Sequence, residues 1–177
     1  MSFKLSFERL ALYSQWMNAG IYEATEKLSV DEQNKDRGAF FGSIIGILNH
    51  LVVGDTFWFK RFAEHQASFE SLEYFRSMAK PNSLGAIVHA DLMTLREKRE
   101  RMDENIILFT SELTDDVISS SLSYKNSTGE EFNKNFGHLL QHVFNHQTHH
   151  RGQVSTLLYQ AGVDIGVTDM LAGIPND

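Results

Sequence analysis

The sequence predicts an all-α protein, a four-helix bundle with a small β-hairpin before the last helix. Apolar residues recur at helical spacing over four long segments. The two prolines, at positions 81 and 175, lie outside those segments, so nothing in them forbids long helices. One short stretch instead alternates and contains a turn sequence. A length of 177 residues suits one domain, and we assign residues 1–177 to it.

The first helix is predicted over residues 6–28, with Gly20 as a tolerated weak point. A polar connection over residues 29–38 follows, in which Ser29 or Asp31 is expected to cap a short turn. The apolar stripe of the helix recurs every three or four positions. Its members are Leu10, Tyr13, Met17, Ile21, Ala24 and Leu28.

The second helix, predicted over residues 39–65, is apolar or small on nearly every side, which is typical of a central buried helix. His50 lies in its middle, with Gly46 one turn before and Gly54 one turn after. Each glycine costs a helix interior about 1 kcal/mol relative to alanine, so space is wanted at these positions. Two interpretations stand: close packing of a neighbouring helix, or a cavity above a metal.

Residues 66–83 are predicted to form an irregular link that ends with Ser83 as a helix cap. The third helix follows over residues 84–113. It carries a dense run of charges at residues 96–101. We expect this run to form a solvated face with ion pairs between residues four apart.

The hairpin is predicted within residues 117–133, with its turn at residues 126–129. The last helix is predicted over residues 134–161. Gly162 is a natural residue to close it, because glycine adopts the left-handed conformation that often ends a helix. A further short turn is expected around residues 169–171.

Composition narrows the classes of function. The net charge of −7 and the absence of long basic runs argue against nucleic acid as a partner. No apolar run approaches the ~18 residues that a membrane span needs, so we expect a cytoplasmic protein without a membrane partner. The absence of cysteine removes thiolate nucleophiles and thiolate metal ligands, which leaves histidine and carboxylate as the strong ligands.

The stretch 138–150 within the last helix holds five of the eight histidines. Four of the five repeat at steps of four, which places them one helical turn apart on one face. Imidazole pairs at that spacing can chelate a single transition metal. The five are His138, His142, His146, His149 and His150.

Helical phase separates these histidines. At 100° per residue the apolar positions of the last helix centre near +80° from His146. His150 lies about 40° and His146 about 80° from that centre, so this pair borders the buried face. The other three lie roughly 120–160° away and are expected to face solvent or the rim.

Two ligands leave a metal ion underfilled, so a third must come from elsewhere in the chain. His50 is the best candidate, because it lies in the middle of an apolar helix between two glycines. His65 and His89 lie near helix ends among polar residues and are expected to be surface histidines. Four further side chains lie within sequence reach of the ligands, and we expect ordinary surface or capping roles for them: Asn49, Asp55, Asn145 and Gln153.

Three neutral imidazoles leave at least one coordination position open, as catalytic zinc sites do. Without thiolates, several divalent ions suit such a set of donors, and spacing does not choose among them. We expect Zn²⁺ or Ni²⁺ first, with Fe²⁺ and Co²⁺ as alternatives.

Two stretches of the chain resemble the DinB family. They are Gly-Ser-Ile-Ile-Gly-Ile-Leu-Asn-His-Leu-Val-Val-Gly-Asp-Thr-Phe-Trp over residues 42–58, and His-Val-Phe-Asn-His-Gln-Thr-His-His-Arg-Gly-Gln over residues 142–153. The resemblance implies an up-down-down-up bundle, a homodimer and a divalent site at His50, His146 and His150. It also implies kinship with thiol-dependent S-transferases and mycothiol-dependent maleylpyruvate isomerases. Those isomerases place a glutamate where this chain has His146, so their substrate does not transfer directly.

Three functions fit the sequence. The first is a metal-dependent enzyme that activates a small thiol or water for transfer to, or hydrolysis of, a small electrophile. The second is a non-catalytic metal-binding stress protein, a sensor or buffer, in which His138, His142 and His149 offer secondary sites. The third is a plain structural bundle whose histidines are satisfied core or rim groups.

Overall fold

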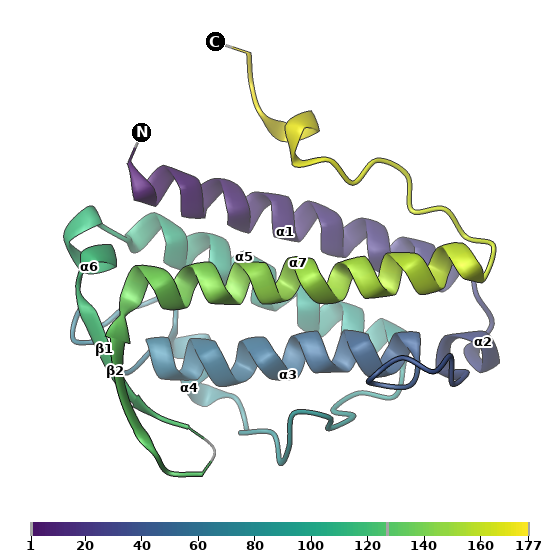
Figure 1. The fold of residues 1–177 in the computed structure, drawn as a ribbon, viewed down its shortest axis with the longest axis horizontal. Coiled ribbons are helices and arrows are strands. Elements are labelled where there is room, and N and C mark those ends of the chain that lie inside the picture. Colours follow the sequence, from purple (N-terminus) through teal and green to yellow (C-terminus); the bar gives the residue numbers. More distant parts are fainter. Residues whose placement is uncertain (1, 127, 177) are drawn as a thin grey trace.

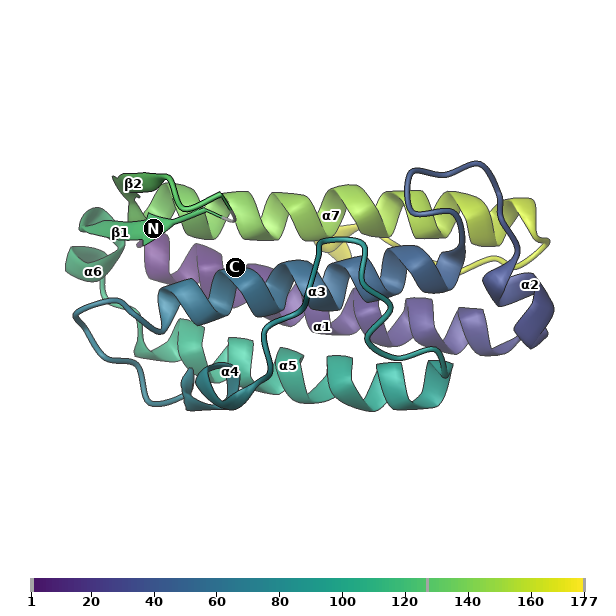
Figure 2. The ribbon, with the colours of Figure 1, turned by 90° about the horizontal axis from the view of Figure 1, so that it is seen from below.

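The computed structural model describes residues 2–126 and 128–176. Its long helices are α1 (Phe3–Glu26), α3 (Ile44–Phe62), α5 (Leu92–Glu112) and α7 (Phe136–Gln160). In it, α1 packs against α5 and α7, and α3 packs against the same two helices from the other side. Helices α1 and α7 begin at the end of the molecule that carries the hairpin, whereas α3 and α5 end there (Figures 1 and 2).

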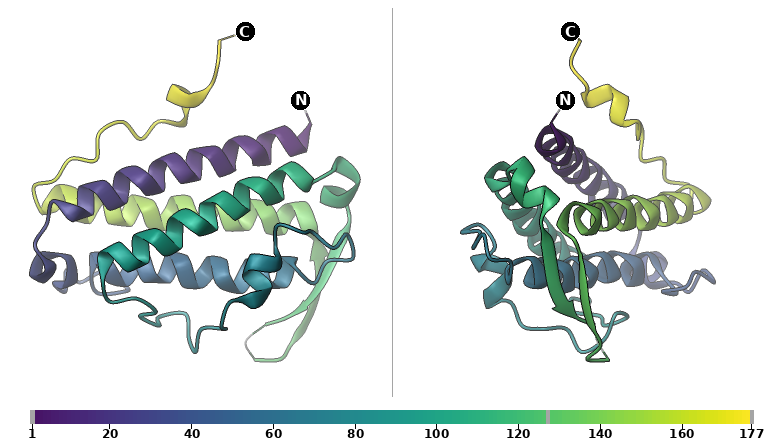
Figure 3. Two further views of the ribbon diagram at one scale, coloured as in Figure 1. Left: turned by 180° about the vertical axis from the view of Figure 1, so that it is seen from behind. Right: turned by 60° about the vertical axis from the view of Figure 1, so that its left-hand side comes forward.

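The two strands form an antiparallel hairpin in which Ser121 lies opposite Asn135. The hairpin projects from the end of the bundle directly before α7 (Figure 3). The structure thus confirms the helical fold and the hairpin that the sequence predicts. The shorter elements are α2 (Val30–Asn34), α4 (Glu73–Ser77), α6 (Asp115–Ser119), β1 (Ser121–Lys125), β2 (Glu131–Asn135) and a 3₁₀ turn, η1 (Met170–Gly173).

The core is formed by the inward faces of the four long helices. Its hairpin end is rich in phenylalanine, and ring pairs such as Phe62 and Phe136 meet edge to face with centroids 5.2 Å apart. Such pairs add to the stabilisation that burial alone provides. The buried phenylalanines at this end include Phe59, Phe62, Phe69, Phe75, Phe109 and Phe136.

The second long helix begins later than predicted, at Ile44 and not at residue 39. Ser43 caps it, because its Oγ accepts a hydrogen bond from the backbone N–H of Gly46 at 3.0 Å. Residues 39–42 form a tight turn closed by pairing of Ala39 with Gly42, whose φ of +73° favours glycine. The prediction failed because the aromatic residues of this turn continue the helical apolar pattern.

The third long helix also begins later, at Leu92 and not at residue 84. Its cap is Asp91, which accepts a hydrogen bond from the N–H of Thr94 at 2.9 Å, and not Ser83. The residues between Ser83 and Asp91 form a loop.

Asn49 fixes that loop. Its side chain is fully buried, where we expected a surface or capping role. The amide oxygen accepts hydrogen bonds from the N–H groups of Val88 and His89, at 2.8 and 3.0 Å, and the amide nitrogen donates to the carbonyl of His89 at 2.9 Å. One side chain of α3 therefore holds the chain that leads into α5.

Arg99 corrects the prediction of a wholly solvated charge run. The expected pair of Arg96 with Glu100 is present on the surface, but the side chain of Arg99 is only 2% exposed. Its Nη1 donates to Asp55 Oδ2 at 2.6 Å, and its Nη2 forms an ion pair with Asp103 Oδ1 at 2.9 Å without the alignment of a hydrogen bond. Asp55, for which we expected a surface role, is therefore a buried counter-ion.

The same buried network reaches the other two long helices. Asn18 of α1 donates to both oxygens of Asp103 at 3.0 Å. Gln147 of α7 donates to Asp55 at 2.6 Å, and Arg151 donates to the amide oxygen of Gln147 at 3.3 Å. All four long helices are thus joined through hydrogen bonds that fix how α7 lies against α3.

His65 is buried, not on the surface as expected, and is 4% exposed. The N–H of Ala67 donates to its Nδ1 at 3.1 Å, so a neutral ring carries its proton on Nε2, which lies 2.9 Å from Ser120 Oγ. The ring also stacks on Phe136 with centroids 4.6 Å apart. His65 therefore ties the end of α3 to the residue that precedes the hairpin.

Acid is expected to weaken this tie. Burial lowers the pKa of His65, so below an unfolded pKa of about 6.5 the unfolded chain binds a proton that the folded chain does not. The contribution is complete above that pH and is lost as the pH falls. We expect the urea midpoint of metal-free protein to decrease between pH 7.5 and 5.0, and the decrease to be smaller in His65→Gln. An equal decrease in both proteins would contradict this role.

Candidate metal centre

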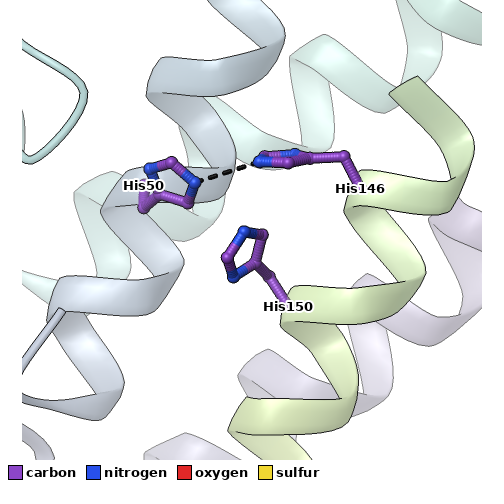
Figure 4. Close-up of side chains that lie close together, drawn as sticks. All are labelled: His50, His146 and His150. Carbon is purple, nitrogen blue, oxygen red and sulfur yellow. Dashed lines mark hydrogen bonds between the residues drawn. The ribbon is translucent and has the colours of Figure 1, made fainter. Parts of the chain in front are cut away.

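Three histidines from two helices converge, as the sequence predicted (Figure 4). His50 comes from α3, whereas His146 and His150 come from successive turns of α7. One ring nitrogen from each lies within 4.8 Å of the others, and Nε2 of His50 is 3.0 Å from Nε2 of His146. Two nitrogens bound at ~2.0–2.1 Å to one ion stand roughly 3 Å apart. The arrangement of these donors therefore fits a divalent transition metal.

Hydrogen bonds at the far side of two rings orient these donors. Nδ1 of His50 lies 2.8 Å from the carbonyl oxygen of Leu84, which only accepts, so Nδ1 carries the proton. Nδ1 of His150 likewise lies 2.8 Å from the amide oxygen of Gln153. Both rings are left with an Nε2 lone pair for a metal, which is the usual arrangement around metal-binding histidines. Gln153 thus supports the site, whereas we expected an ordinary surface role.

The electrostatics of the site favour neutral rings. Burial lowers the pKa of His50 and of His150. Burial, together with the neighbouring rings of His150 and His50, lowers the pKa of His146 to about 3. Imidazole binds a metal only when it is neutral. Three neutral imidazoles are therefore available to bind a metal at neutral pH. We call His50, His146 and His150 the metal-ready cluster.

Glycine is needed at the two positions on either side of His50 for different reasons. A Cβ on Gly54 would lie 3.0 Å from Cε1 of His146, so Gly54 makes room for a proposed ligand. A Cβ on Gly46 would lie 2.0 Å from the carbonyl oxygen of Phe41, so Gly46 permits the turn before α3 to pack closely. Space is thus needed at both positions, as the sequence predicted, but Gly46 packs against the turn before its own helix and not against a neighbouring helix, and Gly54 leaves room for the ring of His146 and not for an open cavity.

Adding a methyl group at Gly54 is expected to weaken metal binding about tenfold. This is the lower end of the loss of metal affinity seen when the groups that position a metal ligand are changed. The ring of His146 has to move because the added Cβ is tighter against it than an ordinary contact. Calorimetric titration of Gly54→Ala with Zn²⁺ measures the effect. Gly152→Ala is the matched control, because a Cβ there meets nothing within 4 Å. Equal affinities for the two variants would show that the ring of His146 needs no such space.

Phe41 covers one side of the centre, and sequence reasoning did not single it out. Its ring stacks on His50 with centroids 3.8 Å apart and meets His150 edge-on at 5.6 Å. Phe40, which is 90% exposed, packs edge-on against Phe41. The signal was present in the glycines at positions 38 and 42, whose positive φ angles build the turn that carries these rings.

The remaining histidines of α7 lie where helical phase put them. His138, His142 and His149 are exposed, and the metal-ready cluster does not include them. Asn145 is exposed, as expected. His89 is half-buried and contributes its backbone to the loop that Asn49 holds.

Fold and site together define a helical-bundle protein with a three-histidine centre that could bind a metal. The model of the DinB family matches residues 1–175, and the chain belongs to that family. It is similar to Protein DinB of Bacillus subtilis (strain 168), with 26% identity over 161 residues that cover 91% of this chain and 89% of that protein. A search of solved structures gives no significant match. Among the described residues, no helix has both the length and the apolar character to cross a membrane.

Proposed function

We propose that this protein is a divalent-metal-dependent enzyme that activates a small thiol or water for transfer to, or hydrolysis of, a small electrophile. The observation that carries the proposal is the convergence of three neutral imidazoles from His50, His146 and His150. A divalent ion held by three protein ligands keeps an open position, where it acts as a Lewis acid and lowers the pKa of a bound water to about 7.

The protein's own residues prepare this chemistry in three ways. Leu84 and Gln153 hold the rings of His50 and His150 in the orientation that a metal needs. Phe41 shields one side of the centre from water, which strengthens electrostatic interactions inside it. The buried contact of Asp55 with Gln147 fixes the two ligand-bearing helices against each other.

The family resemblance favours a thiol over water as the activated group. The test is turnover by protein loaded in turn with Zn²⁺, Ni²⁺, Fe²⁺ or Co²⁺, with low-molecular-weight thiols and small electrophiles as substrates. We expect one metal to give thiol-dependent consumption of electrophile that His50→Ala abolishes. A filled centre without turnover by any pair of substrates, or hydrolysis without thiol, would count against thiol transfer.

A second candidate is a metal-binding stress protein without turnover, a sensor or buffer. The three exposed histidines of α7, His138, His142 and His149, favour it, because they line one surface beside the centre. Metal titration separates the two candidates. Binding of additional ions that disappears in a His142→Ala/His149→Ala double variant supports storage, whereas one tight site unaffected by those changes supports an enzyme.

A homodimer and a cytoplasmic location remain predictions. Light scattering coupled to gel filtration, with and without metal, tests the homodimer directly.

A further inference from the structure

A groove runs along the outer face of α7 from the candidate metal centre to the hairpin. It consists of two adjoining hollows of about 440 and 520 Å³. Both are lined by His138 and His142, and the first also reaches the proposed ligand His146. We call the two together the hairpin groove. The far end is lined by Trp58 of α3, Tyr124 of β1 and Lys134 of β2.

The far end has an aromatic wall. The half-buried indole of Trp58 meets the ring of Tyr124 at 5.5 Å and the ring of His142 at 5.1 Å, both nearly edge to face. Rings held by their neighbours in this way form a rigid apolar surface. Such a surface suits a flat organic group better than a flexible chain.

The far end is also basic. Lys134 lines it, and the guanidinium of Arg61, which does not line the groove itself, lies behind the wall at 4.7 Å from the ring centre of Trp58 and 5.2 Å from that of Tyr124. Across the described part of the chain, no carboxylate forms an ion pair with Arg61 or with Lys134. By contrast, Lys125 on the same hairpin is paired with Glu131 at 3.0 Å.

Unpaired cations are notable in a chain whose net charge is −7. Two of them beside one aromatic wall create a local positive potential that attracts anions. A planar ligand with one negative charge therefore satisfies both features of the far end.

We propose that the far end of the hairpin groove binds the anionic aromatic part of the substrate, an aryl carboxylate whose ring packs on Trp58 and whose carboxylate lies at Lys134. The statement that the other end of this substrate reacts at the metal centre rests on the proposed function. Binding in the groove itself needs no metal.

The test compares 4-nitrobenzoate with the neutral 4-nitrobenzamide, which differ in charge but not in ring. The full chain carrying Trp16→Phe leaves Trp58 as its one tryptophan, so quenching of fluorescence reports binding beside Trp58. Protein stripped with a chelator excludes binding of the carboxylate to a metal. We expect the carboxylate to bind at least about fivefold more tightly than the amide, and added salt to reduce this preference.

Charge removal locates the site. Lys134→Gln is expected to weaken binding of the carboxylate about three- to fivefold, and to leave binding of the amide unchanged. Lys125→Gln is the matched control and should have no effect, because that lysine is already paired. Circular dichroism verifies that each variant is folded.

Equal quenching by acid and amide, or unchanged affinity in folded Lys134→Gln, would overturn the proposal. The result is independent of the proposed function, because it is obtained without metal. Metal binding and turnover without groove binding would leave the enzyme proposal intact and remove this one. Groove binding without turnover would support this proposal and count against the enzyme proposal.

Discussion

Replacing His146 by alanine is expected to abolish stoichiometric metal binding, lowering metal affinity by well over the ~10-fold that a lost supporting group costs. The two remaining imidazoles, of His50 and His150, underfill a tetrahedral or octahedral ion. Elemental analysis of purified protein should therefore show about one ion per chain in the natural sequence and almost none in the variant. Near-stoichiometric metal in the variant would show that the metal binds at other residues.

The matched control for this change is His142→Ala. His142 lies one turn before His146 on the same helix but is exposed and outside the cluster. The control should retain its metal. Equal loss in both variants would point to binding along the exposed face of α7 and would contradict the three-histidine centre.

Metal is also expected to stabilise the fold. An ion present at about 100 times its dissociation constant adds roughly 2.7 kcal/mol to the free energy of unfolding. A chelator should therefore lower the melting temperature of the natural protein at neutral pH and leave that of His146→Ala unchanged. Because burial lowers the pKa of all three rings, the effect should persist to about pH 6 and disappear as protons displace the ion in stronger acid.

The sequence predicted the metal-ready cluster because two independent patterns agree. Helical phase selected His146 and His150 from five histidines, and the glycines on either side marked His50. Both signals lie within single helices, where the spacing of side chains follows from the geometry of one turn. No local pattern could have paired His150 with Gln153 in preference to its other polar neighbours, and the role of Phe41 depends on a turn that resembles the start of a helix.

The charged groups show where local patterns fail. Arg99 lies in a run of six charged residues that is typical of a solvated surface, yet its partner Asp55 is 44 positions away on another helix. Burial of a charge depends on a counter-charge that only the packed fold brings near. The same limit explains His65, whose partner Ser120 is 55 positions distant. Periodicity thus fixes helices and faces, whereas buried polar partners follow from how the helices pack.

Arg99→Met is expected to destabilise the protein by about 3–5 kcal/mol, the usual cost of breaking a buried ion pair from one side. It leaves the carboxylates of Asp55 and Asp103, which are 1% and 4% exposed, without their shared cation. Urea denaturation at pH 7.5 measures the loss. Arg96→Met is the matched control on the same helix, where the two partly exposed pairs with Glu26 and Glu100 contribute less than about 1 kcal/mol each.

A dependence on pH separates the loss of charge from the loss of packing. Burial already raises the pKa of the Asp103 carboxyl in the folded protein and Arg99 opposes this rise, so loss of the guanidinium raises that pKa further above its unfolded value of about 3.9. A group shifted in this direction destabilises the fold at high pH, and the penalty shrinks as the pH falls toward the unfolded pKa. The difference in stability between natural protein and Arg99→Met should therefore narrow from pH 7.5 to 5.0, and the histidine contributions cancel because both proteins share them. A difference that is constant with pH would assign the loss to packing of the arginine side chain, and the buried network would then join the four helices through shape more than through charge.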